Sequence, residues 1–147
     1  MKPRVAIVAL GVALLLWPIL PPLLHACNLH AFAAALEWPW SQTCHRLPDR
    51  TLRVFGWFMP MGSRCMGLDV GFALGLVVAR PYRGPALMWS WMAFAGALLV
   101  LEMLTQNAGI HPVWHVTRFA TGALFAYPIG VALAAIVVRS RPEVSDA

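Results

Sequence analysis

Charged residues are scarce in this sequence. Asp, Glu, Lys and Arg together make up 12% of the 147 residues, whereas hydrophobic residues make up 60%. Soluble domains carry roughly 25% charged residues, and a soluble chain of this length cannot bury so much apolar surface because its surface-to-volume ratio is too high. The shortage of charge therefore excludes an ordinary soluble domain and favours a protein whose apolar side chains face lipid.

A concentrated basic stretch is missing as well. The sequence pI is about 9.9, but the eleven Lys and Arg residues are scattered at the ends of apolar segments. Nucleic-acid binders gather such residues on one face, whereas flanking basic residues are typical of membrane topology. We therefore expect the lipid bilayer, and not nucleic acid, as a partner. The sequence also lacks a Gly-rich phosphate loop, a Ser-His-Asp set and a pair of haem-ligating histidines.

Four apolar segments approach the roughly 20 residues that a helix needs to cross a bilayer. They predict an all-α integral membrane bundle, a single domain with a structured outer loop between the first two helices. Residues 25–42 contain Trp38 and Trp40 and are predicted to form a short interfacial helix, because Trp favours the headgroup level. The predicted transmembrane helices cover residues 5–24, 65–79, 85–104 and 116–138.

Glycine recurs at every fourth position in the second segment, at Gly67, Gly71 and Gly75. Small residues at this spacing form a helix face that another helix can approach closely. The face therefore predicts a helical partner, which is either a membrane protein or a second copy of this chain.

The arrangement of basic residues gives an orientation. Arg80 and Arg83 form a very short basic turn, which is typical of a cytoplasmic hairpin. We therefore expect a multi-pass protein of the bacterial inner membrane with both termini in the cytoplasm. Residues 2–27 also resemble a secretory signal, which is the alternative reading of this segment.

In that topology, residues with metal-binding or thiol chemistry meet at the outer face. Cys44, His45, Cys65 and Asp69 (or His115) suit a tetrahedral zinc site, and thiolates with imidazole also suit copper. A disulfide between Cys44 and Cys65 is the second interpretation, since it fits an oxidising outer compartment. Free thiols that only pack are the third. With Cys27, the cysteine count is odd, so at least one thiol is unpaired within the chain.

Arginines crowd the same region. Arg46, Arg50, Arg53 and Arg64 suit an anion such as a phosphate headgroup, with the alternative that they only extend toward the aqueous interface.

Three ionisable groups lie nearest to the hydrocarbon, namely Asp69, Glu102 and Arg118. Each needs a partner there, and we expect Arg118 to pair with Glu102 or Asp69. Arg50, Arg64, Glu102 and Arg118 are thus candidate anion-binding or structural residues around the thiol site.

Two motifs resemble a known family. Cys44-His45-Arg46-Leu-Pro-Asp49-Arg50-Thr51, followed by Met59-Pro60-Met-Gly62-Ser-Arg64-Cys65-Met-Gly67, is similar to the boxes of an uncharacterised bacterial membrane family, catalogued as domain of unknown function 2085. A later Arg118 with Thr121-Gly122 also matches, so the resemblance spans residues 43–122. The sequence departs from the family pattern at Arg46, where Gln is usual, at Gly62, where the first Cys of a Cys-x-x-Cys box stands, and at Asp69, where an aromatic is usual.

The family supplies no established activity. We expect a small membrane protein that binds zinc or copper at an outward-facing Cys/His site, or that serves a metalloprotein as an accessory. The alternatives are an enzyme, working by thiol–disulfide exchange or on lipid phosphates, and a structural subunit of a larger membrane complex. The residues alone do not decide whether the chain is an enzyme.

Overall fold

The computed structural model describes residues 3–44, 46–78 and 84–139, and most of these residues are helical. The elements follow one another as α1 (Pro3–Leu16), η1 (Trp17–Ile19), α2 (Leu20–Ala26), α3 (His30–Ser41), η2 (Pro48–Arg50), β1 (Arg53–Val54), β2 (Trp57–Phe58), α4 (Ser63–Val78), α5 (Pro85–Asn107) and α6 (His115–Arg139).

Three helical segments are long and apolar enough to cross a membrane, namely Arg4–Ala26, Pro85–Asn107 and His115–Val138. The prediction of a helical membrane protein is thus confirmed at this level. The remaining predicted span, residues 65–79, falls mostly on α4. The described helix has 16 residues, which corresponds to roughly 24 Å, so it is shorter than the other three.

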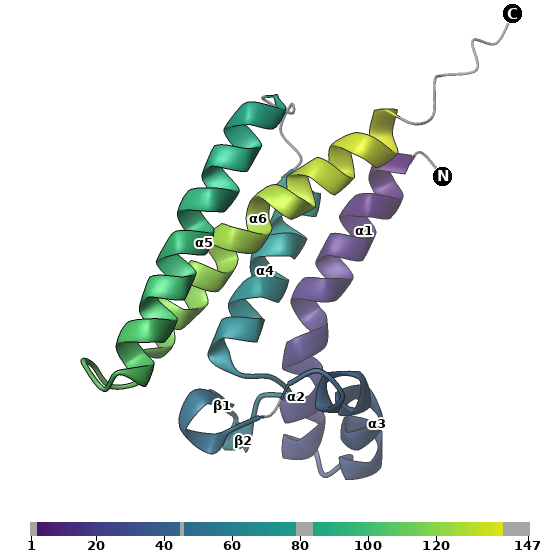
Figure 1. Cartoon of the computed structure of the whole chain (residues 1–147). Coiled ribbons are helices and arrows are strands. Elements are labelled where there is room, and N and C mark those ends of the chain that lie inside the picture. Colours follow the sequence, from purple (N-terminus) through teal and green to yellow (C-terminus); the bar gives the residue numbers. More distant parts are fainter. Residues whose placement is uncertain (1–2, 45, 79–83, 140–147) are drawn as a thin grey trace, which may run out of the picture.

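The helices α1, α4, α5 and α6 lie side by side, and successive ones run in opposite directions (Figure 1). The α4 helix packs most extensively against α6 and also contacts α1, whereas α5 packs on α6. The start of α1 and the end of α6 lie at one end of this bundle (Figure 1). The opposite end carries α2, α3, β1 and β2 together with the first turns of α4 and α6, and is called the site end below.

The glycines of α4 allow close contact with α6. A Cβ atom added to Gly71 would lie 2.2 Å from the carbonyl oxygen of Ala123, and one added to Gly67 would lie 2.1 Å from that of Phe119. Backbone therefore meets backbone along this interface, as the glycine spacing predicts. The partner of this face is α6 of the same chain, so the glycines are no evidence for a second protein.

The segment between α3 and α4 was only partly anticipated. The interfacial helix predicted within residues 25–42 corresponds to α3. Residues 53–58, by contrast, form a short antiparallel hairpin in which Arg53 pairs with Phe58. Its turn is formed by Phe55 and Gly56, both with positive φ, as a tight hairpin turn requires. The helix predicted at residues 65–79 therefore begins after this hairpin, at Ser63.

Proline shapes the end of the first segment. The α1 helix ends at Leu16, and η1 contains Pro18 before α2 resumes the helical path. Proline lacks the backbone N–H that an α-helix needs at interior positions, which explains the change to a tighter turn. The chain then reverses into α3, whose docking on α2 places the following loop beside the start of α4.

Candidate functional site

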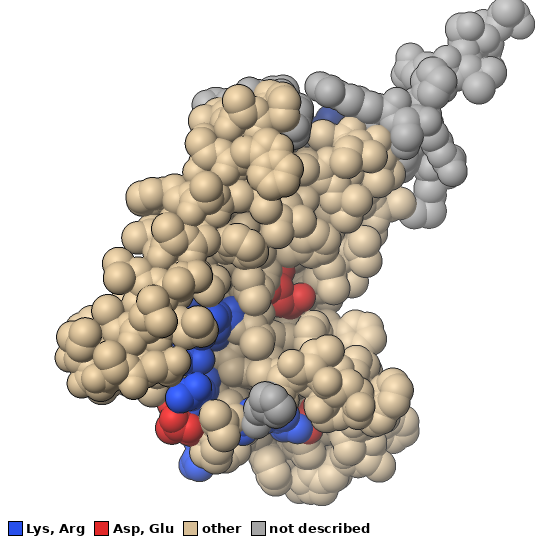
Figure 2. All heavy atoms as spheres, viewed as in Figure 1, with Lys and Arg blue, Asp and Glu red and all other residues tan. Residues whose placement is uncertain are grey.

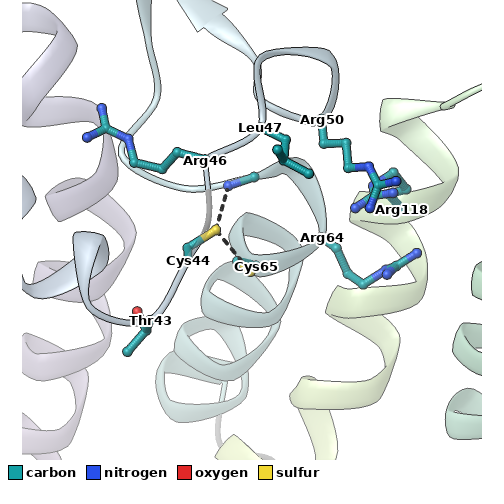
Figure 3. A pocket seen from close by; sticks show the side chains of 9 residues that line it. Thr43, Cys44, Arg46, Leu47, Arg50, Arg64, Cys65 and Arg118 are labelled. Carbon is teal, nitrogen blue, oxygen red and sulfur yellow. Dashed lines mark hydrogen bonds between the residues drawn. The ribbon is translucent and has the colours of Figure 1, made fainter.

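A pocket of about 210 Å³ opens at the site end. Its walls come from the loop after α3, the first turn of α4 and the first turns of α6 (Figure 3). The residues that line it are Thr43, Cys44, Arg46, Leu47, Arg50, Gly62, Arg64, Cys65 and Arg118. Basic side chains gather at this end of the molecule in Figure 2.

The two cysteines of the pocket are in contact. The sulfur atoms of Cys44 and Cys65 lie 3.6 Å apart, and neither residue is in a disulfide. Cys44 follows α3, whereas Cys65 lies in the first turn of α4, so the approach depends on the whole intervening loop. The backbone N–H of Gly62 also donates a hydrogen bond to Cys44 Sγ over 3.3 Å.

The surroundings of Cys44 favour its thiolate. Burial raises the pKa of the Cys44 thiol, but hydrogen bonds from the backbone N–H groups of Gly62 and Arg46 and from the Cys65 thiol, together with the charge of Arg46, outweigh that effect. The pKa of Cys44 therefore lies below its ordinary value. Low-pKa thiols beside donors and cations are the nucleophilic or metal-binding ones.

Three arginines approach the pocket from different elements. Arg64 of α4 forms an ion pair with Glu102 of α5. Arg118 of α6 is only 6% exposed, and its guanidinium donates a hydrogen bond to Gln106 Oε1. Arg50 of η2 lies 3.5 Å from the carboxylate of Asp49. In Figure 3 the guanidinium groups of Arg50 and Arg118 lie beside one another.

The prediction that Arg118 pairs with Glu102 or Asp69 is wrong. Glu102 pairs with Arg64, and no carboxylate in the described part of the chain lies within ion-pair distance of Arg118. Asp69 forms no ion pair within the same residues, and its Oδ2 is buried without a hydrogen-bond partner. Which of two cations a buried Glu reaches depends on helix rotation, which the sequence does not encode locally.

The predicted metal ligands are only partly brought together. Cys44 and Cys65 line the pocket, whereas Asp69 and His115 do not. His45 lies outside the described residues. Within residues 3–44, 46–78 and 84–139, no group of three or more His, Cys, Asp or Glu side chains converges as a metal site. Of the four predicted ligands, the described structure therefore unites the two sulfurs.

A second polar cluster at the site end has no counterpart in the sequence analysis. Glu37 of α3 pairs with Arg46 at 2.9 Å and with His25 at 3.3 Å. The ring of His25 stacks on Trp57, with centroids 4.6 Å apart. These contacts fix α2, α3 and the hairpin together. Arg46 also lines the pocket, but its guanidinium turns toward Glu37 and away from those of Arg50, Arg64 and Arg118 (Figure 3).

Gln106, near the end of α5, was not among the predicted site residues because a single amide carries no distinctive sequence pattern. It supplies the acceptor for Arg118. Gly62 was noted as a departure from a cysteine pattern, but its backbone N–H donor to Cys44 has no sequence signature.

The fold and the site together define a helical membrane protein with a thiol pair in a basic pocket at one end. The chain matches the family described as predicted membrane protein (DUF2085) over residues 44–132. This is more than half of its 147 residues, and the chain belongs to that family.

Two curated relatives are archaeal and uncharacterized. A protein of Methanothermobacter thermautotrophicus is 28% identical over 97 residues, which cover 63% of this chain and 82% of the relative. A protein of Methanocaldococcus jannaschii is 24% identical over 96 residues, covering 61% of this chain and 60% of the relative. No solved structure matches the chain. The relatives' names assign no activity.

Proposed function

We propose that Cys44 and Cys65 form a redox-active thiol pair that exchanges with disulfides of a partner molecule. The single observation that carries this proposal is the 3.6 Å separation of the two sulfur atoms. Cys44 is the attacking thiol because its pKa is lowered, and the thiolate is the form that attacks disulfides. The pocket in front of it supplies access.

The exchange is balanced in two steps. The Cys44 thiolate attacks a partner disulfide, forms a mixed disulfide and releases one partner thiolate. Cys65 then loses its proton and attacks Cys44 Sγ, which releases the second partner sulfur and closes the Cys44–Cys65 disulfide. Two electrons pass to the partner, which leaves as two thiols, and two protons leave the pair.

Zinc or copper binding is the second candidate, and the same distance favours it. Two sulfurs held at about 2.3 Å from one tetrahedral zinc lie roughly 3.8 Å apart, close to the observed 3.6 Å. His45 follows Cys44 directly in the sequence and is the candidate third ligand. In this reading the protein handles the metal or serves a metalloprotein.

The membrane arrangement that accompanies either function has four spans. The α4 helix runs in the direction opposite to α1 and α5 (Figure 1), which supports a fourth crossing. The short basic sequence Arg80-Pro-Tyr-Arg83 supports a cytoplasmic hairpin. Both termini are then cytoplasmic, and the thiol pair faces the outer side of the cytoplasmic membrane. A bacterial source remains a prediction, while the relatives are archaeal.

Mass spectrometry and elemental analysis of the same sample test the two candidates. The protein carrying Cys27→Ser, which removes the exposed third thiol, serves as the matched background. Exchange predicts that reduction adds two hydrogen masses, that the pair titrates with a defined potential, and that no stoichiometric metal is present. Metal binding predicts near-stoichiometric zinc or copper that Cys65→Ser removes.

Two free thiols without metal, unable to exchange with glutathione disulfide, would end both proposals. If the protein in that case co-purifies reproducibly with a membrane partner, the result supports a role as a structural subunit of a larger membrane complex.

A further inference from the structure

The pocket beside the thiols has an unbalanced charge. Among the described residues, four arginines and no carboxylate line it. Glu37 binds Arg46 outside the pocket, and Glu102 binds Arg64. The Asp49 carboxylate beside Arg50 has a side chain that is 61% exposed to solvent, so water screens its charge. The inner wall therefore presents excess positive charge.

Arg118 is the decisive side chain. It is 94% buried, since only 6% of its surface is exposed. Its hydrogen bond goes to the neutral amide of Gln106, and its Nε has no hydrogen-bond partner within the described chain. Buried charges in proteins are ordinarily paired. Arg118, which lines the pocket, thus lacks an anionic partner among the described residues.

Two further guanidinium groups lie near Arg118, although each also has a carboxylate partner of its own. Arg50 and Arg64 repel Arg118 electrostatically, and the buried Nε of each lacks a hydrogen-bond partner among the described residues. Figure 3 shows Arg50 reaching from η2 toward Arg118 on α6, while Arg64 extends from α4. Three elements therefore direct like charges at one space.

We propose that Arg50, Arg64 and Arg118 bind a phosphate group in this pocket. Guanidinium groups suit this ligand because each can donate two parallel hydrogen bonds to its oxygens. The cavity of about 210 Å³ is far larger than a single water requires. The inference is independent of the thiol chemistry, since it uses neither sulfur atom.

The position of the site permits two sources for the phosphate. Arg118 lies three residues after the start of α6, or roughly 5 Å along the helix axis, which is near the level of lipid headgroups. A phospholipid headgroup and free phosphate present the same oxygens to the three arginines. The two sources differ in whether acyl chains add to the binding.

Thermal unfolding of the full chain in a non-ionic detergent tests the proposal. Sodium phosphate is titrated against sodium chloride at equal ionic strength. In parallel, dioctanoyl phosphatidic acid is titrated against dioctanoylglycerol, which has the same chains without the phosphate. A ligand that binds the folded state raises the unfolding temperature as its concentration rises.

Arg118→Gln and Arg50→Gln are each expected to weaken phosphate binding. The phosphate concentration that gives half of the maximal shift in unfolding temperature should rise at least tenfold. Arg50→Gln keeps the test valid if the more buried Arg118 variant fails to fold. Arg53→Gln is the matched control, because Arg53 lies at the same end but stacks on Phe58 and does not line the pocket. Cys44→Ser is expected to leave the shift unchanged, which separates this site from the thiol function.

Each outcome decides the proposal. A shift with both phosphate probes, or with phosphatidic acid alone, that depends on Arg50 supports a headgroup site. A shift with inorganic phosphate alone supports a site for the free ion. No phosphate-specific shift with either probe, or a shift that Arg53→Gln abolishes equally, overturns the assignment to Arg50, Arg64 and Arg118.

Discussion

Cys44 and Cys65 lie with their sulfur atoms 3.6 Å apart although 21 positions separate them in the chain. The chain between the two cysteines forms η2 and the hairpin of β1 and β2. It then turns back, so that the start of α4 lies beside the loop that contains Cys44. The hydrogen bond from Gly62 N–H to Cys44 Sγ joins the end of this segment to its beginning. The loop between α3 and α4 thus holds Cys44 in contact with Cys65.

The lowered pKa of Cys44 predicts a pH-dependent reactivity. Because the thiolate is the reactive form, alkylation of Cys44 should reach half its maximal rate at a pH below about 8.5, the ordinary midpoint for cysteine. Peptide-resolved mass spectrometry after timed iodoacetamide treatment measures this midpoint. Arg46→Gln removes a stabilising positive charge and should move the midpoint upward. A midpoint at or above the ordinary value would contradict the described hydrogen bonds.

The contact between α4 and α6 predicts a second effect. Gly71→Ala introduces a Cβ atom that would lie 2.2 Å from Ala123 O, so the two backbones must separate. We expect a loss of about 1–3 kcal/mol, the usual cost of overpacking, seen as a lower unfolding temperature in detergent. Gly96→Ala is the control, because its Cβ would lie 3.4 Å from the Phe125 ring, a tolerable contact. Equal effects of the two variants would argue against this interface.

The membrane helices were predictable because their pattern is local. Residues 85–104 and 116–138 fall within α5 and α6, since long apolar runs have few alternatives in a bilayer. The glycine face of α4 likewise predicted a closely packed neighbouring helix, but it did not indicate which helix. Choosing α6 over a second chain requires three-dimensional packing that no single helix specifies.

The sequence predicted the location of the candidate site, but it did not predict the ion-pair and hydrogen-bond partners of its residues. Cys44 lies in the loop before α4 and Cys65 lies in the first turn of α4, so both are expected at the same end of this helix. Asp69 shares a helix face with Cys65, yet it is roughly 6 Å deeper along the helix axis and misses the pocket. The partners of Arg64 and Arg118 depend on helix rotation, and the hairpin turn at Phe55 and Gly56 lacks the polar residues that usually mark such turns.

The Arg64–Glu102 pair predicts a large penalty when only one charge is removed. Glu102 is 9% exposed, so Glu102→Gln leaves Arg64 beside Arg118 without its carboxylate. Loss of one partner of a buried pair typically costs about 3–5 kcal/mol. Unfolding in mixed micelles should show this loss, and adding Arg64→Gln should recover part of it. Asp49→Asn, which removes an exposed pair partner, should cost at most about 1 kcal/mol. A Glu102→Gln variant as stable as Asp49→Asn would show that the buried pair is not formed.

Gly62 stands where the family pattern has a cysteine. A Cβ atom at Gly62 would lie 3.8 Å from Cys44 Sγ and 3.3 Å from Arg50 O, so the position faces the thiol pair and accepts a small side chain with slight adjustment. Gly62→Cys should place a third sulfur at the pocket and increase zinc affinity at least tenfold, because three thiolates hold zinc better than two.

Gly62→Ala adds the same Cβ without sulfur and is the matched control for that substitution. Competition with a chromogenic zinc chelator measures both variants and the parent protein. If Gly62→Ala gains as much affinity as Gly62→Cys, the effect comes from packing and not from a ligand. If neither gains, position 62 does not direct a side chain at Cys44, and the loop geometry that joins the two thiols is wrong.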